Sequence, residues 1–151
     1  HAGGVADLLK QQTVPVWGPH ADDGYLLESL PQTTASYASY GFPIAEAFVP
    51  DGWLSEGGKL KVGAYEFDVL HIPGHTPGHV VFYCAAEKLL IAGDVLFYES
   101  IGRTDFPRGN HADLISNITG KLLVLPEDTR VIPGHGRMTT IGHEKRHNPF
   151  L

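Results

Sequence analysis

The stretch HIPGHTPGH, residues 71–79, leads from the end of an apolar segment through a Pro-Gly turn into His75. Two later stretches end in the same way: LLIAGDVLF at residues 89–97, and RVIPGHG at residues 130–136. They place Asp94 and His135 directly after a glycine. The ends of adjacent strands converge at one rim of a sheet, so these three side chains are expected to meet within metal-ligand distance, about 2.0 to 2.2 Å from a zinc-sized ion. A lone histidine after Pro-Gly is more often a hydrogen-bonded turn residue, but three such endings favour a metal site.

Two imidazoles and a carboxylate suit hydrolytic chemistry. A divalent ion held by such ligands lowers the pKa of a bound water from about 15.7 to about 7, which gives a hydroxide nucleophile at neutral pH. A second ion would hold the carbonyl oxygen and stabilise the tetrahedral oxyanion. The pattern therefore suits acyl transfer to water, and a substrate with a good leaving group, such as the thiolate of a thioester, would need no strong general acid.

The composition narrows the class of protein. The 151 residues suit one domain, and 42% of them are hydrophobic. The net charge of −6 comes from scattered acidic residues, which argues against a nucleic-acid partner or an anionic membrane surface. No apolar run approaches the roughly 18 residues that span a bilayer, and no targeting signal is recognisable, so we expect a cytoplasmic protein with a small-molecule substrate. The single Cys84 lies in the apolar run VVFYC and is expected to be a buried core thiol.

Hydrophobic periodicity predicts an α/β chain. The expected elements are a helix over 4–12, a strand over 14–19, β-hairpins over 59–73 and 79–94, a helix over 110–123, a strand over 129–133, and a last helical turn before Pro149. Asn110 is the expected N-cap of the 110–123 helix. Residues 20–56 are expected to be a long connection with a helical segment near its start.

The order of HIPGHTPGH, GDVLF, GRTDFPRG, IPGHG and the closing NPFL resembles the metallo-β-lactamase superfamily. It is most similar to the glyoxalase II-like branch of short bacterial thioester hydrolases, the hydroxyacylglutathione hydrolases. The resemblance covers nearly the whole chain. It implies an αββα four-layer sandwich of the α/β class, with residues 1–151 forming a single domain that is N-terminally truncated.

The resemblance also implies roles for particular residues. His75, Asp94 and His135 correspond to ligands of two divalent metal ions, with Asp94 bridging the two and positioning the metal hydroxide. Zinc is the expected metal, and iron or manganese suit the same ligands. The family has an earlier motif, HxHxDH followed by AGG, of which only the last histidine is present here, as His1. His1 is therefore expected to be a fourth ligand.

Residues around the site have expected roles of their own. The loop SIGRTDFPRG would place Arg103 and Arg108 near the substrate, and Tyr98 is a further candidate for substrate contact. The alternative for Arg103 is a pair with Asp105 that holds the loop, and the alternative for Tyr98 is aromatic packing under the loop. His79 is expected to orient a metal ligand through its free nitrogen rather than to be a ligand. The remaining histidines are expected to be ordinary surface or core residues: His20, His71, His111, His143 and His147.

Three alternatives to thioester hydrolysis stay open. The first is a mononuclear iron persulfide dioxygenase of the same fold, whose sequences share GRTDF but do not need the second metal site that His135 supplies. The second takes His1 as a mature N-terminus that chelates metal through its α-amine and imidazole, which leaves the three glycine turns unexplained. The third is that the 151-residue polypeptide by itself is an inactive fragment, because most of HxHxDH is absent.

A truncated start has a structural consequence. Strands would be missing from one sheet, which leaves an exposed edge and uncovered apolar surface. We therefore expect a homo-oligomer or a complementing N-terminal segment.

Overall fold

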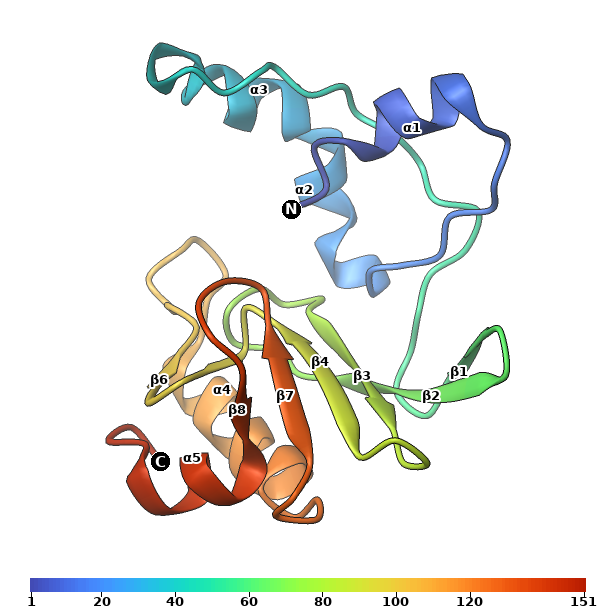
Figure 1. Cartoon of the computed structure of the whole chain (residues 1–151). Coiled ribbons are helices and arrows are strands. Elements are labelled where there is room, and N and C mark those ends of the chain that lie inside the picture. The colour runs from blue at the N-terminus through green and yellow to red at the C-terminus, as the bar shows by residue number, and fades with distance from the viewer. The chain divides into compact units, whose positions relative to one another are not determined.

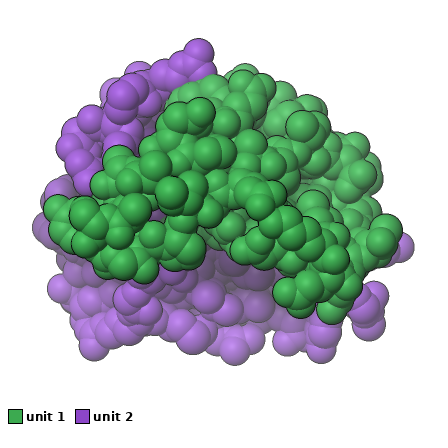
Figure 2. All heavy atoms as spheres, turned by 90° about the horizontal axis from the view of Figure 1, so that it is seen from above, with its two compact units in different colours: residues 1–53 green, residues 54–151 purple.

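The computed structural model describes residues 1–151 and divides into two compact units, residues 1–53 and residues 54–151 (Figures 1 and 2). The single domain expected over residues 1–151 stays a prediction. None of the helices has the length and hydropathy needed to cross a membrane.

The first unit is helical. Its elements are α1 Val5–Gln11, η1 Ala21–Asp23, α2 Gly24–Glu28, α3 Leu30–Ala35 and η2 Ala38–Tyr40. The helix expected over 4–12 is confirmed as α1. The strand expected over 14–19 is wrong, because only Trp17 forms a bridge, to Gly52. Pro15 and Pro19 flank this bridge and have no N–H to donate to a longer ladder.

The second unit is built on a six-stranded sheet (Figure 1). In spatial order its strands are β1 Lys59–Val62, β2 Tyr65–His71, β3 Val80–Cys84, β4 Leu89–Gly93, β7 Arg130–Pro133 and β8 Thr139–Thr140. Neighbouring strands are antiparallel except for β4 and β7, which are parallel. Both expected hairpins and the strand over 129–133 are confirmed. A separate short hairpin pairs β5 Leu96–Phe97 with β6 Ser100–Ile101.

One face of the six-stranded sheet packs against helices and forms the core of this unit. The helices are α4 His111–Asn117, the π-helical turn η3 Ile118–Leu122, and α5 Ile141–His147. The buried apolar side chains come from the central strands and from these helices: Val81, Leu90, Ala92, Val131, Leu114, Ile118, Leu122 and Ile141. Cys84 is buried, as expected. Asn110 caps α4 by accepting from the Asp113 N–H, which confirms the expected cap.

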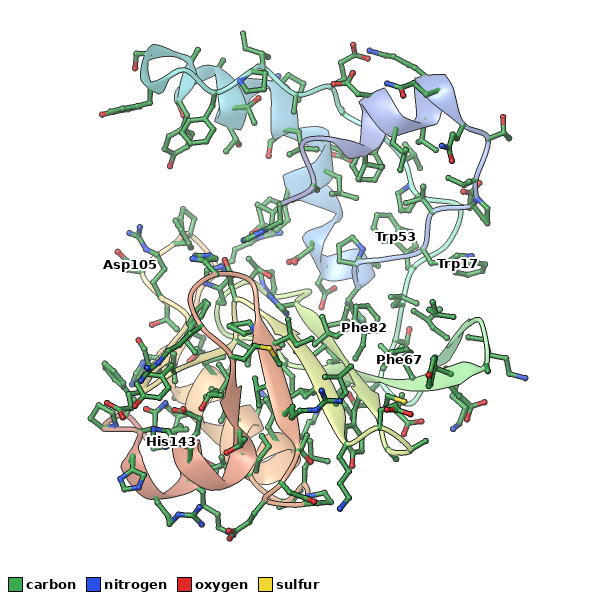
Figure 3. All side chains as sticks on the ribbon, viewed as in Figure 1. Trp17, Trp53, Phe67, Phe82, Asp105 and His143 are labelled. Atoms are coloured by element: carbon green, nitrogen blue, oxygen red, sulfur yellow. The ribbon has the colours of Figure 1, made fainter.

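The opposite face of the same sheet is apolar and open. Leu60, Phe67, Phe82 and Ile91 line a shallow groove there together with Val62. The strand register pairs Leu60 with Phe67, Val69 with Phe82, and Phe82 with Ile91, and Phe67 and Val69 are two residues apart on β2, so these side chains share one face. Figure 3 shows Phe67 and Phe82 standing on this side of β2 and β3.

Candidate functional site

Asp94 and His135 meet where two parallel strands end. Asp94 follows β4, and Gly134-His135 follows β7, which lies beside β4 in the sheet. The Gly134 N–H donates to the Gly93 carbonyl at 2.7 Å, which fixes the two turns against each other. As a result, His135 Nε2 lies 3.0 Å from both carboxylate oxygens of Asp94. The carboxylate is nearly buried, whereas the His135 ring is largely exposed.

His75 approaches the same carboxylate from the connection between β2 and β3. Its Nε2 lies 3.7 Å from Asp94 Oδ2. Its Nδ1 lies 2.7 Å from the Arg103 carbonyl oxygen. A carbonyl only accepts, so Nδ1 carries the proton and a neutral His75 turns the lone pair of Nε2 toward Asp94. That is the tautomer needed for a ligand bound through Nε2.

Glycines make this close approach possible. A Cβ on Gly134 would overlap the Asp94 carboxylate, and a Cβ on Gly102 would overlap the Asp94 carbonyl oxygen. Gly102 directly follows β6, and its N–H donates to the carbonyl of Val95, the residue before β5, at 3.0 Å. Small residues are therefore required on both sides of Asp94.

His79 supports the main chain of Asp94. The Asp94 N–H donates to His79 Nε2 at 3.1 Å. The ring fills the space above Gly93, whose φ of +49° carries the strand into the turn. Burial, with a smaller contribution from the neighbouring His75, lowers the pKa of His79 to about 4. A ring that is neutral at pH 7 can accept from the Asp94 N–H. His79 therefore orients the turn that carries the Asp94 carboxylate, and it does not act on one of the two histidines beside that carboxylate.

The loop after β6 packs on His75 through an aromatic ring. Arg103 forms a two-point pair with Asp105, with Nε–Oδ1 2.6 Å and Nη2–Oδ2 2.7 Å. The same guanidinium lies 4.4 Å from the centre of the Phe106 ring, and Phe106 meets the His75 ring edge-on at 5.4 Å. This pair with Asp105 is the arrangement expected if Arg103 holds the loop, and a role of Arg103 in substrate contact stays a prediction. Arg108 is exposed in the same loop, in a left-handed turn with φ of +67°.

Tyr98 packs between two side chains of the second unit. Its ring stacks on His143 at 4.7 Å, and the Arg137 guanidinium lies 3.3 Å from the ring centre. Figure 3 shows His143 at helix α5 and Asp105 on the loop at the other end of this unit. Aromatic packing was the alternative for Tyr98, and a role in substrate contact stays a prediction. His1 belongs to the first unit, and its role as a ligand also stays a prediction.

Some residues around the site were missed by sequence reasoning. Phe97 lies 5.1 Å from the His135 ring, and Phe106 covers His75. Glu144 is fully buried and accepts from the Glu99 N–H, Thr139 Oγ1 and Asn148 Nδ2, so α5 holds the β5–β6 hairpin that carries Phe97. The phenylalanines stand in the quoted GDVLF and GRTDF segments, which was the available signal. Nothing in the local pattern marks Glu144 as buried.

Comparison with known proteins identifies the family. A family model described as the metallo-beta-lactamase superfamily matches residues 1–135. The chain belongs to this superfamily. The fold expected from the sequence is thus confirmed, and a metallo-beta-lactamase-superfamily hydrolase is the class of enzyme that it supports. Members of the superfamily bind divalent metal ions, which agrees with the kind of donor atoms gathered at Asp94.

The chain is similar to proteins of the glyoxalase II-like branch and to solved metallo-beta-lactamase folds. Hydroxyacylglutathione hydrolase GloC of Haemophilus influenzae is 47% identical over 152 residues, which cover 100% of this chain and 70% of that protein. The crystal structure of the BLEG-1 B3 metallo-beta-lactamase has a TM-score of 0.86 and 43% identity, covering 99% of this chain and 71% of that one. The structure of TTHA1623 in a di-iron-bound form has a TM-score of 0.86 and 40% identity, covering 100% and 72%. ETHE1 from Myxococcus xanthus is more distant, with a TM-score of 0.67 and 28% identity, covering 97% and 68%.

Proposed function

We propose that this protein hydrolyses thioesters of the hydroxyacylglutathione type with the help of two divalent metal ions, zinc foremost. The observation that carries the proposal is the Asp94 carboxylate, nearly buried at the sheet edge and faced by Nε2 of both His75 and His135. The similarity to the hydroxyacylglutathione hydrolase of Haemophilus influenzae supports the choice of substrate class.

The residues present fit a metal centre. Two imidazole nitrogens and a carboxylate are donors that zinc, iron and manganese all accept, and the glycines beside Asp94 keep the space around the carboxylate free of side chains. His75, Asp94 and His135 would hold the ions together with His1, with Asp94 shared between them. When bound, such ions lower the pKa of a coordinated water to about 7 and polarise a carbonyl oxygen.

The chain's own side chains prepare this centre. The Arg103 carbonyl holds His75 in the tautomer that leaves Nε2 available, and His79 holds the main chain of Asp94. Phe106 meets His75 edge-on and Phe97 lies beside His135, so each ring shields part of a ligand from water. Within the loop, Arg108 and Arg103 are the candidate cations for a substrate carboxylate, with Arg103 already paired to Asp105.

A persulfide dioxygenase of the same fold is the second candidate, because the segment GRTDF is shared with such enzymes. The position of His135 favours the hydrolase. By the family resemblance His135 belongs to the second metal site, which a single-iron enzyme does not need, and here His135 lies 3.0 Å from Asp94.

The test compares the two reactions on the metal-loaded intact gene product. We expect release of glutathione from S-lactoylglutathione and no oxygen uptake with glutathione persulfide. Asp94→Asn keeps the size of the side chain but removes its charge, so both bound metal and kcat/KM should fall, the latter by at least about 100-fold. Bound metal is measured by elemental analysis.

Asp128→Asn is the matched control, because Asp128 is exposed and pairs only with Lys88 among the ion pairs of this unit. It should retain activity and metal. Oxygen consumption without thioester hydrolysis would overturn the proposed function, as would full hydrolysis by Asp94→Asn.

A further inference from the structure

Glu144 is an acidic residue of helix α5 that is fully buried. Its Oε2 accepts from the Glu99 N–H at 2.9 Å and from Asn148 Nδ2 at 2.8 Å. Its Oε1 accepts from Thr139 Oγ1 at 2.5 Å. A buried carboxyl group without partners would destabilise the fold, and here both oxygens have one. Through this single side chain, α5 is bonded to strand β8 and to the β5–β6 hairpin (Figure 1).

The two segments bonded to Glu144 are those that flank the His135 ring. Thr139 begins β8, the strand that follows the His135 turn along the chain. Glu99 lies in the turn between β5 and β6, and Phe97 of the same hairpin has its ring centre 5.1 Å from that of His135. One buried side chain therefore ties the chain downstream of His135 to the aromatic ring beside it.

The turn between β5 and β6 has to be held by its surroundings. Glu99 has a φ of +52°, in the left-handed region that is costly for a residue with a side chain. Besides its main-chain bond to α5, its Oε1 lies 3.0 Å from His143 Nε2. Asn148, directly after α5, donates from Nδ2 to the Ser100 carbonyl at 3.1 Å. The hairpin is thus fixed to α5 on both sides of its turn.

We infer that Glu144 is a positioning residue for His135, which it fixes beside Asp94 by holding β8 and Phe97. The inference deepens the proposed function, in which His135 is a metal ligand. The His135 side chain is 64% exposed, so its orientation depends on a fixed main chain and on the ring beside it. Groups that orient a metal ligand without touching the metal typically change metal affinity by about 10- to 100-fold when they are removed.

The first measurement is the affinity of the intact gene product for zinc, by competition with a coloured chelator. Glu144→Ala removes both oxygens and should lower this affinity by about 10- to 100-fold. Glu144→Gln should keep most of it. The amide carbonyl can accept from the Glu99 N–H and Asn148 Nδ2, while the amide NH2 donates to the Thr139 hydroxyl.

The second measurement follows the His135 ring itself and needs neither metal nor activity. In the metal-free intact gene product, ring protons of Phe97 and His135 should show a nuclear Overhauser effect, because the ring centres are 5.1 Å apart. Glu144→Ala should lose this effect and Glu144→Gln should retain it. An unchanged effect in Glu144→Ala would overturn the inference.

Leu122→Ala is the matched control for lost stability. Leu122 is fully buried in the core of the same unit and belongs to η3, so its truncation leaves the bonds of Glu144 in place. The urea midpoint of unfolding should fall, while zinc affinity and the Overhauser effect stay unchanged. An equal loss of zinc affinity in Leu122→Ala and Glu144→Ala would contradict a positioning role. If Glu144→Ala does not fold, Asn148→Ala, which frees the Ser100 carbonyl, decides by the same Overhauser effect.

These measurements separate the inference from the proposed function. If S-lactoylglutathione is not hydrolysed but Glu144→Ala loses the zinc affinity and the Overhauser effect, the hydrolase proposal fails and the positioning role stands. If S-lactoylglutathione is hydrolysed but Glu144→Ala keeps both, the positioning role alone fails.

Discussion

Asp94 shows how single side chains depend on their immediate neighbours. Its carboxylate lies beside His135 Nε2, and its N–H donates to His79 Nε2. Its carbonyl oxygen has room only because residue 102 is a glycine. The meeting of His75, Asp94 and His135 was predictable from the sequence, because each follows a glycine near the end of a strand and has a side chain with a suitable donor atom. The aromatic cover by Phe97 and Phe106 was not, because it depends on which rings the folded loops bring to the imidazoles.

Asp105 offers a test of the loop at residue scale. The Arg103 guanidinium beside it lowers the pKa of this carboxyl from 3.8 to about 2. The folded-state pKa lies below the unfolded value, so the contribution of the ion pair is present above about pH 4 and is lost as the pH falls through 2. An NMR titration of the Asp105 carboxyl carbon should give a midpoint of about 2.

In the Arg103→Gln variant the midpoint should return toward 3.8, the ordinary value. Because the pair is exposed, we expect little change in overall stability in either direction. A wild-type midpoint near the ordinary value would show that the pair is absent in solution.

At the scale of elements, the helices and strands that the sequence predicts correctly are those with a long hydrophobic pattern. The hairpin β1–β2 was recognisable from its alternation of apolar and polar residues, and β3–β4 from two apolar runs joined by a short turn. Helix α4 was recognisable from an apolar stripe and an N-cap. Two-residue strands such as β8 carry no readable period, and they exist because a neighbouring strand pairs with them. The strand expected over 14–19 failed because proline limits pairing more strongly than its apolar neighbours favour it.

The N-terminus of helix α4 is bonded to the segment that carries His75. Asn110 caps it through the Asp113 N–H, and the Asn110 N–H donates to the Gly74 carbonyl at 2.8 Å, next to His75. Asn110→Ala removes the cap and should lower the free energy of unfolding by about 1 kcal/mol. Asn110→Asp keeps a capping oxygen and should lose much less. Urea unfolding followed by circular dichroism measures both, and equal losses would contradict the capping role.

At the scale of the second unit, the two faces of the sheet differ. One face is closed by α4, η3 and α5, and the other exposes the groove of Leu60, Phe67 and Phe82.

The groove should bind an apolar dye. Val62 is 63% exposed at its edge, so Val62→Glu places a negative charge there, which repels the sulfonate of the dye, without disturbing the core. We expect the fluorescence of anilinonaphthalene sulfonate with the 151-residue chain to fall by about half in this variant. Val49→Glu is the control, because Val49 is 82% exposed and does not line the groove. Equal fluorescence in both variants would mean that the dye binds elsewhere.

The parallel pairing of β4 with β7 has a consequence for the order of folding. Asp94 and His135 are 41 residues apart in the chain, and only this one parallel pair brings their turns together. Closing so long a loop carries an entropic cost that local hairpins do not have, so β1–β2 and β3–β4 are free to form earlier. Asp94 and His135 therefore come together late, and metal capture by this pair would report the completion of folding rather than its start.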